Sequence, residues 1–237
     1  MIKNKKVKWI VRTLLLVGTV VSMFFVPWIL VKAWILPLPD TIQEQVDEAI
    51  GYGFDGMIVY VDQTGKPPAY YTGGWKDREK KIPADPKSLF KIASISKLYT
   101  SVAATKLVKE KRLSFDKTLT EYLPELKGRI ENAEKITLKM MIQHRSGIPN
   151  FTDNPAYWEN EQQNGKNALD FALDLPASFK PDKGYEYSNT NYLLLRSIMD
   201  DVLGYSHNKY IKEKILIPLE LKNTFFSITE VDLDDVM

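Results

Sequence analysis

The stretch from Ser88 to Glu110 reads SLFKIASISKLYTSVAATKLVKE, and its character changes partway along. Residues 88–94 favour an extended segment, which leads into a helix predicted over roughly residues 95–110. Ser94 therefore lies where the extended chain becomes helical, at the positive end of that helix. The residues expected on the apolar side of this helix are Leu98, Val102, Leu107 and Val108.

A serine three residues before a lysine on a helix places both side chains on one face, about one turn apart. A neutral lysine amine at that distance can take the hydroxyl proton and make the serine an acyl acceptor. Only Ser94 stands at the start of a patterned helix, where apolar neighbours favour the neutral form of Lys97. The residues alone leave open a second interpretation, a helix N-cap beside a solvated lysine. The pairs that share this spacing are Ser88/Lys91, Ser94/Lys97, Ser114/Lys117 and Ser206/Lys209.

A second group of polar residues lies in the run GYEYSNTNYLLL, residues 184–195. Tyr187 and Asn189 stand just before a helix predicted from about Thr190 to Leu203. A tyrosine beside an ammonium group can shuttle a proton, and an asparagine amide both donates and accepts hydrogen bonds. The alternative is an Asx-type cap for this helix. The tyrosines interpreted as packing residues are Tyr185 and Tyr192.

The amino-terminal segment predicts a membrane anchor. Residues 1–12 form a basic tip, and residues 13–31 run TLLLVGTVVSMFFVPWILV without a charge. A helix of that length is about 29 Å long, near the roughly 30 Å of bilayer hydrocarbon. The preceding basic residues predict a cytoplasmic amino terminus and an extracytoplasmic body. A cleaved signal peptide is the alternative. Residues 32–40 are then a linker, and residues 41–237 form the body.

Composition excludes several classes of function. Residues 1–39 hold six of the 32 Lys and Arg and none of the 30 Asp and Glu, which leaves 26 basic against 30 acidic residues in the remainder. This mildly acidic body does not indicate a nucleic-acid partner. The chain has no cysteine and only two histidines, His144 and His207, and it lacks a glycine-rich nucleotide loop. We therefore expect no metal and no organic cofactor.

The body predicts an α+β fold in which strands come first and helices follow. Residues 41–50 suit an amphipathic helix, and residues 57–61 and 69–75 suit an antiparallel hairpin. The charged residues 76–87, which include two prolines, predict a loop. From residue 111 to 180 the pattern favours helices and loops without a convincing strand.

Four segments occur in an order and at a spacing that resemble the serine β-lactamase-related hydrolases, especially class C β-lactamases and D-alanyl-D-alanine carboxypeptidases. This resemblance covers about residues 41–230. It implies a partial β-lactamase/transpeptidase-like fold, with an antiparallel sheet flanked by helices and an all-helical subdomain. The four segments are IASISKLYT (92–100), HRSGIPNF (144–151), GYEYSNTNYLLL (184–195) and IPLELKNTFF (217–226).

The resemblance also implies roles for individual residues. Ser94 corresponds to the acylated nucleophile and Lys97 to its general base, while Tyr187 corresponds to the partner acid/base. Asn189 corresponds to the residue that binds the substrate amide. The backbone N–H of Ser94 corresponds to half of an oxyanion hole. His144 matches a family loop and is interpreted as structural.

One family motif is missing from these residues. A Lys-Thr-Gly or His-x-Gly triplet is expected about a hundred residues after Asn189, and no such triplet occurs before Met237. We therefore expect a carboxyl-terminally truncated domain without its final strands. The leading hypothesis is a membrane-anchored serine hydrolase acting on D-Ala-D-Ala-like peptides, β-lactams or small esters and amides. The alternatives are a catalytically inactive, membrane-tethered binding protein and a non-functional fragment. The sequence does not indicate an oligomeric state.

Overall fold

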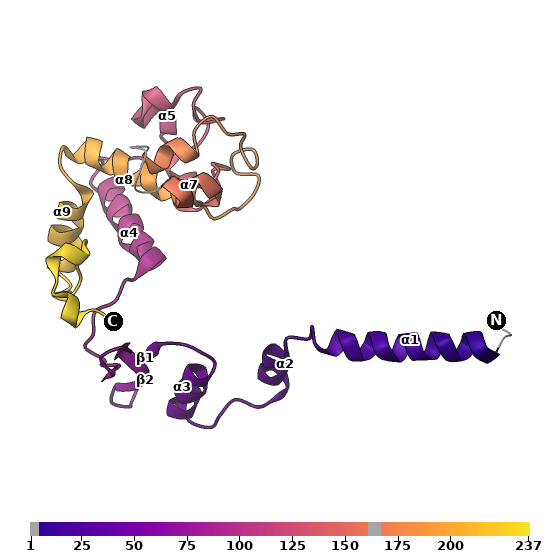
Figure 1. The fold of residues 1–237 in the computed structure, drawn as a ribbon. Helices are drawn as coiled ribbons and strands as arrows, with labels where there is room; N and C mark the ends of the chain where they lie inside the picture. Colours follow the sequence, from indigo (N-terminus) through magenta and orange to yellow (C-terminus); the bar gives the residue numbers. More distant parts are fainter. Residues whose placement is uncertain (1–4, 161–166) are drawn as a thin grey trace. The chain divides into compact units, whose positions relative to one another are not determined.

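The computed structural model describes residues 5–160 and 167–237. Contacts divide the chain into two compact units, Met1–Ser88 with Asp235–Met237, and Leu89–Asp234. The α-helices and strands of these residues, drawn in Figure 1, are α1 (Lys5–Met23), α2 (Trp28–Ile35), α3 (Ile42–Gly51), β1 (Gly56–Val61), β2 (Ala69–Asp77), β3 (Ile82–Pro83), α4 (Ser96–Lys109), α5 (Leu119–Tyr122), α6 (Leu138–Ile142), α7 (Pro155–Asn160), α8 (Asn189–Leu203) and α9 (His207–Ile211).

The continuous helix expected over residues 13–31 is broken into α1 and α2, which are bent by 78°. Pro27 explains the break, because it has no N–H and its ring clashes with the carbonyl four residues earlier. That carbonyl, of Met23, instead accepts a hydrogen bond from the indole of Trp28 at 2.9 Å. No single helix in residues 5–160 and 167–237 is long and apolar enough to cross a membrane, and only the bent pair together has that length and composition.

The first unit contains a three-stranded antiparallel sheet in the order β1-β2-β3. The β1–β2 hairpin is confirmed, with Val59 opposite Tyr71. Helix α3, confirmed over Ile42–Gly51, packs on β2 at Gly73, where a Cβ would lie 2.8 Å from a Val46 methyl. The prediction of a loop over residues 76–87 is wrong in part, because β2 extends to Asp77 and β3 pairs with it.

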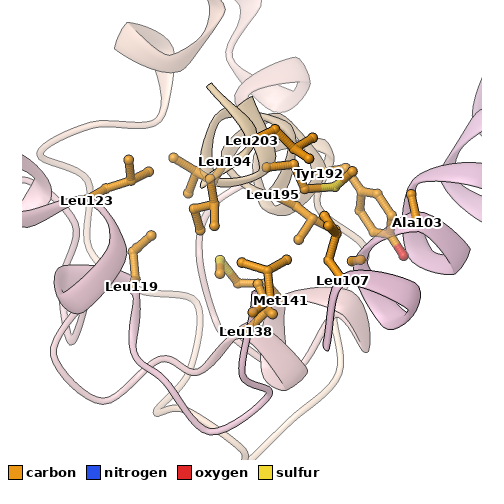
Figure 2. Packing of buried hydrophobic residues seen from close by; sticks show 14 of the residues in the cluster. Ala103, Leu107, Leu119, Leu123, Leu138, Met141, Tyr192, Leu194, Leu195 and Leu203 are labelled. Carbon is orange, nitrogen blue, oxygen red and sulfur yellow. The ribbon is translucent and has the colours of Figure 1, made fainter. Parts of the chain in front are cut away.

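The second unit is helical and encloses the main hydrophobic core. Helix α4 packs against α8, and α6 packs against α8 as well. Figure 2 shows side chains from all three helices pointing into one cluster. Burial of each such leucine contributes about 1.5–3 kcal/mol. The labelled members of the cluster are Ala103, Leu107, Leu119, Leu123, Leu138, Met141, Tyr192, Leu194, Leu195 and Leu203.

The face that helix α4 buries matches the expected one only in part. Leu107 is fully buried as predicted, but Leu98 and Val102 are 63% and 40% exposed. The buried face instead continues through Thr100, Ala103 and Ala104. Small side chains let packed helices come close together, which fits the alanines on the buried face of α4.

The remaining sequence predictions for this unit are largely confirmed. Helix α8 ends at Gly204, which has φ +73° and forms the left-handed C-cap. In the part of residues 111–180 that the structure describes, the chain forms short helices and turns, with isolated bridges such as Thr118–Thr137. The expected extended segment over residues 88–94 ends early, because Ala93–Ile95 form a 3-10 turn that leads into α4.

Candidate active site

Ser94 lies in the 3-10 turn that precedes α4, and its side chain is exposed. The residue before it, Ala93, has φ +43°, a left-handed conformation that costs free energy for any residue with a Cβ. This kink separates the incoming chain from the helix and leaves the Ser94 hydroxyl at its start. Strained backbone of this kind clusters at functional sites.

Lys97 lies one turn further along, on the same face as Ser94, as the spacing predicts. Its Nζ donates hydrogen bonds to Ser94 Oγ at 3.2 Å and to Asn189 Oδ1 at 2.7 Å. The hydroxyls of Ser114 and Ser206 have other partners, since each accepts a backbone N–H two residues later. These two serines therefore close local turns, while Ser94 is in contact with its lysine.

Tyr187 reaches the same hydroxyl from the segment before α8. Its phenol oxygen lies 2.6 Å from Ser94 Oγ and also donates to Asn189 Oδ1 at 3.3 Å. Partial burial opposes ionisation of the phenol, but polar interactions with Lys97 and Ser94 and the positive charge of Lys97 together lower the pKa of Tyr187. A phenol with a lowered pKa exchanges protons more readily near neutral pH.

Asn189 is the first residue of α8 and joins the group through its carbonyl oxygen. The amide nitrogen points the other way and donates to Asn150 Oδ1 and Thr152 Oγ1, both at 3.2 Å. The resemblance implies that this amide binds substrate. In the structure both ends of the amide already have protein partners, and its oxygen holds Lys97.

The His144 ring packs against the ring of Tyr187. Its ring is buried and lies 4.7 Å from the Tyr187 ring and 5.2 Å from the Tyr192 ring, measured between centroids. Its Nδ1 accepts the backbone N–H of Ser188 at 3.1 Å, so the proton of the neutral ring is on Nε2. Burial, and then repulsion by the charge of Lys97, lower the pKa of His144. His144 thus fixes the segment that carries Tyr187, in agreement with its structural interpretation.

Residues 144–147 (HRSG) bind the segment that precedes Tyr187 through backbone hydrogen bonds. The carbonyls of His144, Arg145 and Gly147 accept the N–H groups of Glu186, Asp182 and Ser178, respectively. Gly147 has φ +76°, and a Cβ there would lie 2.1 Å from the carbonyl oxygen of Phe179. Only glycine fits this close approach.

The interpretation of Tyr185 and Tyr192 as packing residues holds for only one of them. Tyr192 is 6% exposed, and its hydroxyl hydrogen bonds to Ser101 at 2.8 Å and to the Ile142 carbonyl at 3.1 Å, so the packing interpretation is confirmed. Tyr185 is 68% exposed and touches only the edge of the His144 ring, so for this residue the interpretation is wrong.

Sequence reasoning missed the polar residues that contact Asn189. Asn150 and Thr152 lie in the motif HRSGIPNF and directly after it, but nothing in the local pattern distinguishes them from ordinary turn residues. Among residues 5–160 and 167–237, no group of three or more His, Asp or Glu side chains is arranged to hold a metal ion.

Comparison with known proteins relates this geometry to a family. The beta-lactamase family profile matches residues 38–233. The chain is 29% identical to protein flp of Staphylococcus aureus (strain MW2) over 198 residues, which cover 81% of this chain and 40% of flp. It is 27% identical over 202 residues to N-acetylmuramyl-L-alanine amidase of Bacillus subtilis (strain 168), covering 78% of this chain and 46% of the amidase.

Solved structures show the same similarity. The D-amino acid amidase from Ochrobactrum anthropi SV3, complexed with L-phenylalanine amide, superposes with a TM-score of 0.70 and 25% identity over 82% of this chain and 55% of the amidase. The octameric penicillin-binding protein homologue from Pyrococcus abyssi superposes with a TM-score of 0.69 and 29% identity over 81% of this chain and 45% of the homologue. The chain thus spans about half the length of these relatives.

Proposed function

The chain belongs to the beta-lactamase family, and we propose that it is a membrane-anchored serine hydrolase that works through an acyl-enzyme. The observation that carries this proposal is the position of Ser94 Oγ, which is 2.6 Å from the Tyr187 hydroxyl and 3.2 Å from Lys97 Nζ. A hydroxyl in contact with two proton-transferring groups is arranged to lose its proton as it attacks a carbonyl.

In the acylation step, Ser94 Oγ forms a bond to the substrate carbonyl carbon, and Lys97, once its ammonium has lost a proton to solvent, takes the hydroxyl proton. The tetrahedral intermediate then breaks its bond to the leaving group, which takes a proton from Tyr187. The Lys97 ammonium returns a proton to the Tyr187 phenolate, which restores both groups. Water next attacks the Ser94 ester, and the acid product leaves as Ser94 Oγ is protonated again.

The carbonyl oxygen of the substrate becomes negatively charged in the tetrahedral intermediate, and a hydrogen-bond donor is needed to stabilise it. The backbone N–H of Ser94 belongs to the first turn before α4, where N–H groups have no partner within the helix. It is also at the positive end of that helix. We assign it as one oxyanion donor, a group whose loss from such a site typically slows turnover by about 10²–10³-fold.

The substrates we propose are small amides and peptides ending in D-amino acids, together with β-lactams and esters that share the same acyl chemistry. Support comes from the relatives, which include proteins named as a D-amino acid amidase and an N-acetylmuramyl-L-alanine amidase. All of these substrates place a carbonyl carbon within reach of a serine nucleophile. The proposal requires no metal or organic cofactor and no nucleic acid.

The proposed location is the outer face of a cell membrane, with α1 and α2 in the bilayer. Lys5, Lys6, Lys8 and Arg12 precede the apolar part of α1, which supports a cytoplasmic amino terminus. Alkaline carbonate washing of membranes tests this: the full chain is expected in the pellet, and a chain that begins at residue 41 in the supernatant. Full-length protein in the carbonate wash would contradict the anchor.

Covalent labelling tests the chemistry. A fluorescent penicillin and a fluorophosphonate are added separately to the full chain in detergent, and labelling is read on a denaturing gel. Ser94→Ala should abolish labelling by any probe that reacts. Ser96→Ala is the matched control. Ser96 is two residues after Ser94, and its Oγ accepts a hydrogen bond from Arg196 rather than from Lys97. Equal labelling of Ser94→Ala and the unsubstituted protein would overturn the assignment.

Assays of peptide binding and hydrolysis distinguish the hydrolase from the alternative of an inactive, membrane-tethered binding protein. A tethered binding protein retains a cell-wall stem peptide without labelling, without turnover and without dependence on Lys97. Slow hydrolysis that is lost in Lys97→Ala eliminates this alternative.

A further inference from the structure

The side chain of Asn189 is held by a second asparagine, Asn150. Asn150 Oδ1 accepts two hydrogen bonds from Asn189, one from the backbone N–H at 3.0 Å and one from Nδ2 at 3.2 Å. A carboxamide has an oxygen at one end and an NH₂ group at the other. Because the Asn189 NH₂ group faces Asn150, its oxygen faces Lys97.

Asn150 is oriented in turn by Asp153. The NH₂ group of Asn150 donates to Asp153 Oδ1 at 2.8 Å and to Thr152 Oγ1 at 2.7 Å. An ionised carboxylate only accepts hydrogen bonds, so it selects the NH₂ end of the Asn150 amide. Thr152 is less selective, because a hydroxyl both donates and accepts. Asp153 therefore selects the same orientation of Asn150 as the Asn189 backbone N–H, which only donates and so faces Asn150 Oδ1.

We propose that Asp153 is a positioning residue that acts through Asn150 to orient the Asn189 amide and so holds the Lys97 amine against Ser94. If the Asn189 amide turned over, its NH₂ group would face the Lys97 Nζ, and two donors would then face each other. Lys97 would lose its 2.7 Å contact with Asn189 Oδ1, which aligns Nζ with Ser94 Oγ. This inference rests on the proposed acylation of Ser94.

Asp153 and Asn150 have no role at the substrate in the proposed mechanism, and they reach Lys97 only through Asn189. Asp153 is exposed, so its removal leaves no unpaired buried charge. Asn150 and Thr152 are half-buried; Asn150 is the N-cap of a 3-10 helix over Phe151–Asp153, which contains Thr152 and precedes α7. The ionisable groups near Lys97 are Tyr187, Tyr192 and His144, and all of them remain in the variants below.

A double-mutant cycle isolates the orienting role. Asp153→Leu removes the carboxylate and is expected to slow acylation by a probe threefold to tenfold, with the half-saturating probe concentration unchanged. Asn150→Ala removes the side chain through which Asp153 acts, so the acylation rate no longer depends on position 153. Asp153→Leu made in the Asn150→Ala chain should therefore slow acylation less than twofold. Non-additivity of this kind measures coupling between the two positions.

A matched control lies in the same loop. The side chain of Asn154 donates to the Phe171 carbonyl and accepts from the Ala156 N–H, without contacting Asn189. Asn154→Ala should leave the acylation rate within twofold of the unsubstituted protein. Equal losses from Asp153→Leu in both backgrounds, or no loss in either, would overturn the proposed orientation.

A readout that does not require turnover separates this inference from the proposed function. The full chain labelled with [¹⁵N]asparagine in detergent gives side-chain amide resonances, of which that of Asn189 is identified by its loss in Asn189→Asp. Asp153→Leu should shift this resonance, and the shift should be absent in the Asn150→Ala background. If the acylating probes fail to modify Ser94 but the Asn189 resonance shifts as described, the proposed function is rejected and the inference stands. If the probes modify Ser94 but the resonance does not shift in this way, only the inference is rejected.

Discussion

The phenol oxygen of Tyr187 lies 2.6 Å from Ser94 Oγ, although 93 residues separate the two in the chain. Each comes from a segment just before a long helix of the second unit, Ser94 before α4 and Tyr187 before α8. These two helices pack against each other, and their amino-terminal ends bring the two hydroxyls together. The arrangement supports proton transfer to and from a single serine.

Replacement of Lys97 by methionine tests its assignment as the general base. Methionine keeps an unbranched apolar side chain of similar length but takes no proton, so labelling of Ser94 should slow by about 10²–10⁴-fold. Lys109→Met is the control, because Lys109 is exposed in the last turn of the same helix. A labelling rate for Lys97→Met within threefold of that for Lys109→Met would argue that another group removes the proton.

Tyr187→Phe removes one hydroxyl and should affect amides more than activated esters. An amide nitrogen must be protonated as it leaves, whereas a nitrophenolate leaves without a proton. We expect a loss of about 10²-fold or more in kcat/KM for an anilide and a clearly smaller loss for a nitrophenyl ester of the same acyl group. Equal losses for the two substrates would show that Tyr187 is not the proton donor to the leaving group.

His144 predicts a specific dependence of stability on pH. Its folded-state pKa is lowered from the ordinary value of 6.5, because burial and the charge of Lys97 disfavour the imidazolium. Between that value and the lower folded one, the unfolded chain binds more protons than the folded chain, so the free energy of unfolding falls as pH falls through this window. Denaturant unfolding between about pH 7 and pH 5 measures this loss.

His144→Asn is the comparison for that measurement. Asparagine tolerates the left-handed backbone at this position, where φ is +57°, and its oxygen can accept the Ser188 N–H. Its amide does not titrate, so the slope of stability against pH should become shallower. An unchanged slope would assign the pH dependence to other groups.

Two glycines with nearly equal backbone angles should respond differently to alanine. Gly128 has φ +79° and open space at the Cβ position, so Gly128→Ala should cost only about 1–2 kcal/mol of left-handed strain. Gly147 has φ +76° and the Phe179 carbonyl oxygen 2.1 Å from that position, so Gly147→Ala adds a backbone clash. We expect it to cost at least about 3 kcal/mol. Equal destabilisation in urea titrations would contradict the close approach.

Much of the local structure follows from the sequence because its causes are local. The helix over Ile42–Gly51 begins with the capping box of Thr41 and Glu44, and α8 ends at Gly204. The break at Pro27 also has a local cause, since a proline inside an apolar run is itself a helix-breaking feature. The buried side of α4 follows from the sequence only in part: Leu107 is buried as predicted, whereas Leu98 and Val102 are exposed, because tertiary packing decides which side of this helix is covered.

Some features of the candidate site likewise follow from the local sequence, and others depend on tertiary packing. The sequence by itself determined that Ser94 and Lys97 share a helix face, since the period of an α-helix is about 3.6 residues in any context. It also identified Tyr187 and Asn189 as residues at the start of a second helix. Only the tertiary structure decided that these helices bring the four side chains together and that the Asn189 oxygen faces Lys97. That orientation depends on Asn150, which Asp153 orients locally and which meets Asn189 only when segments 39 residues apart have folded against each other.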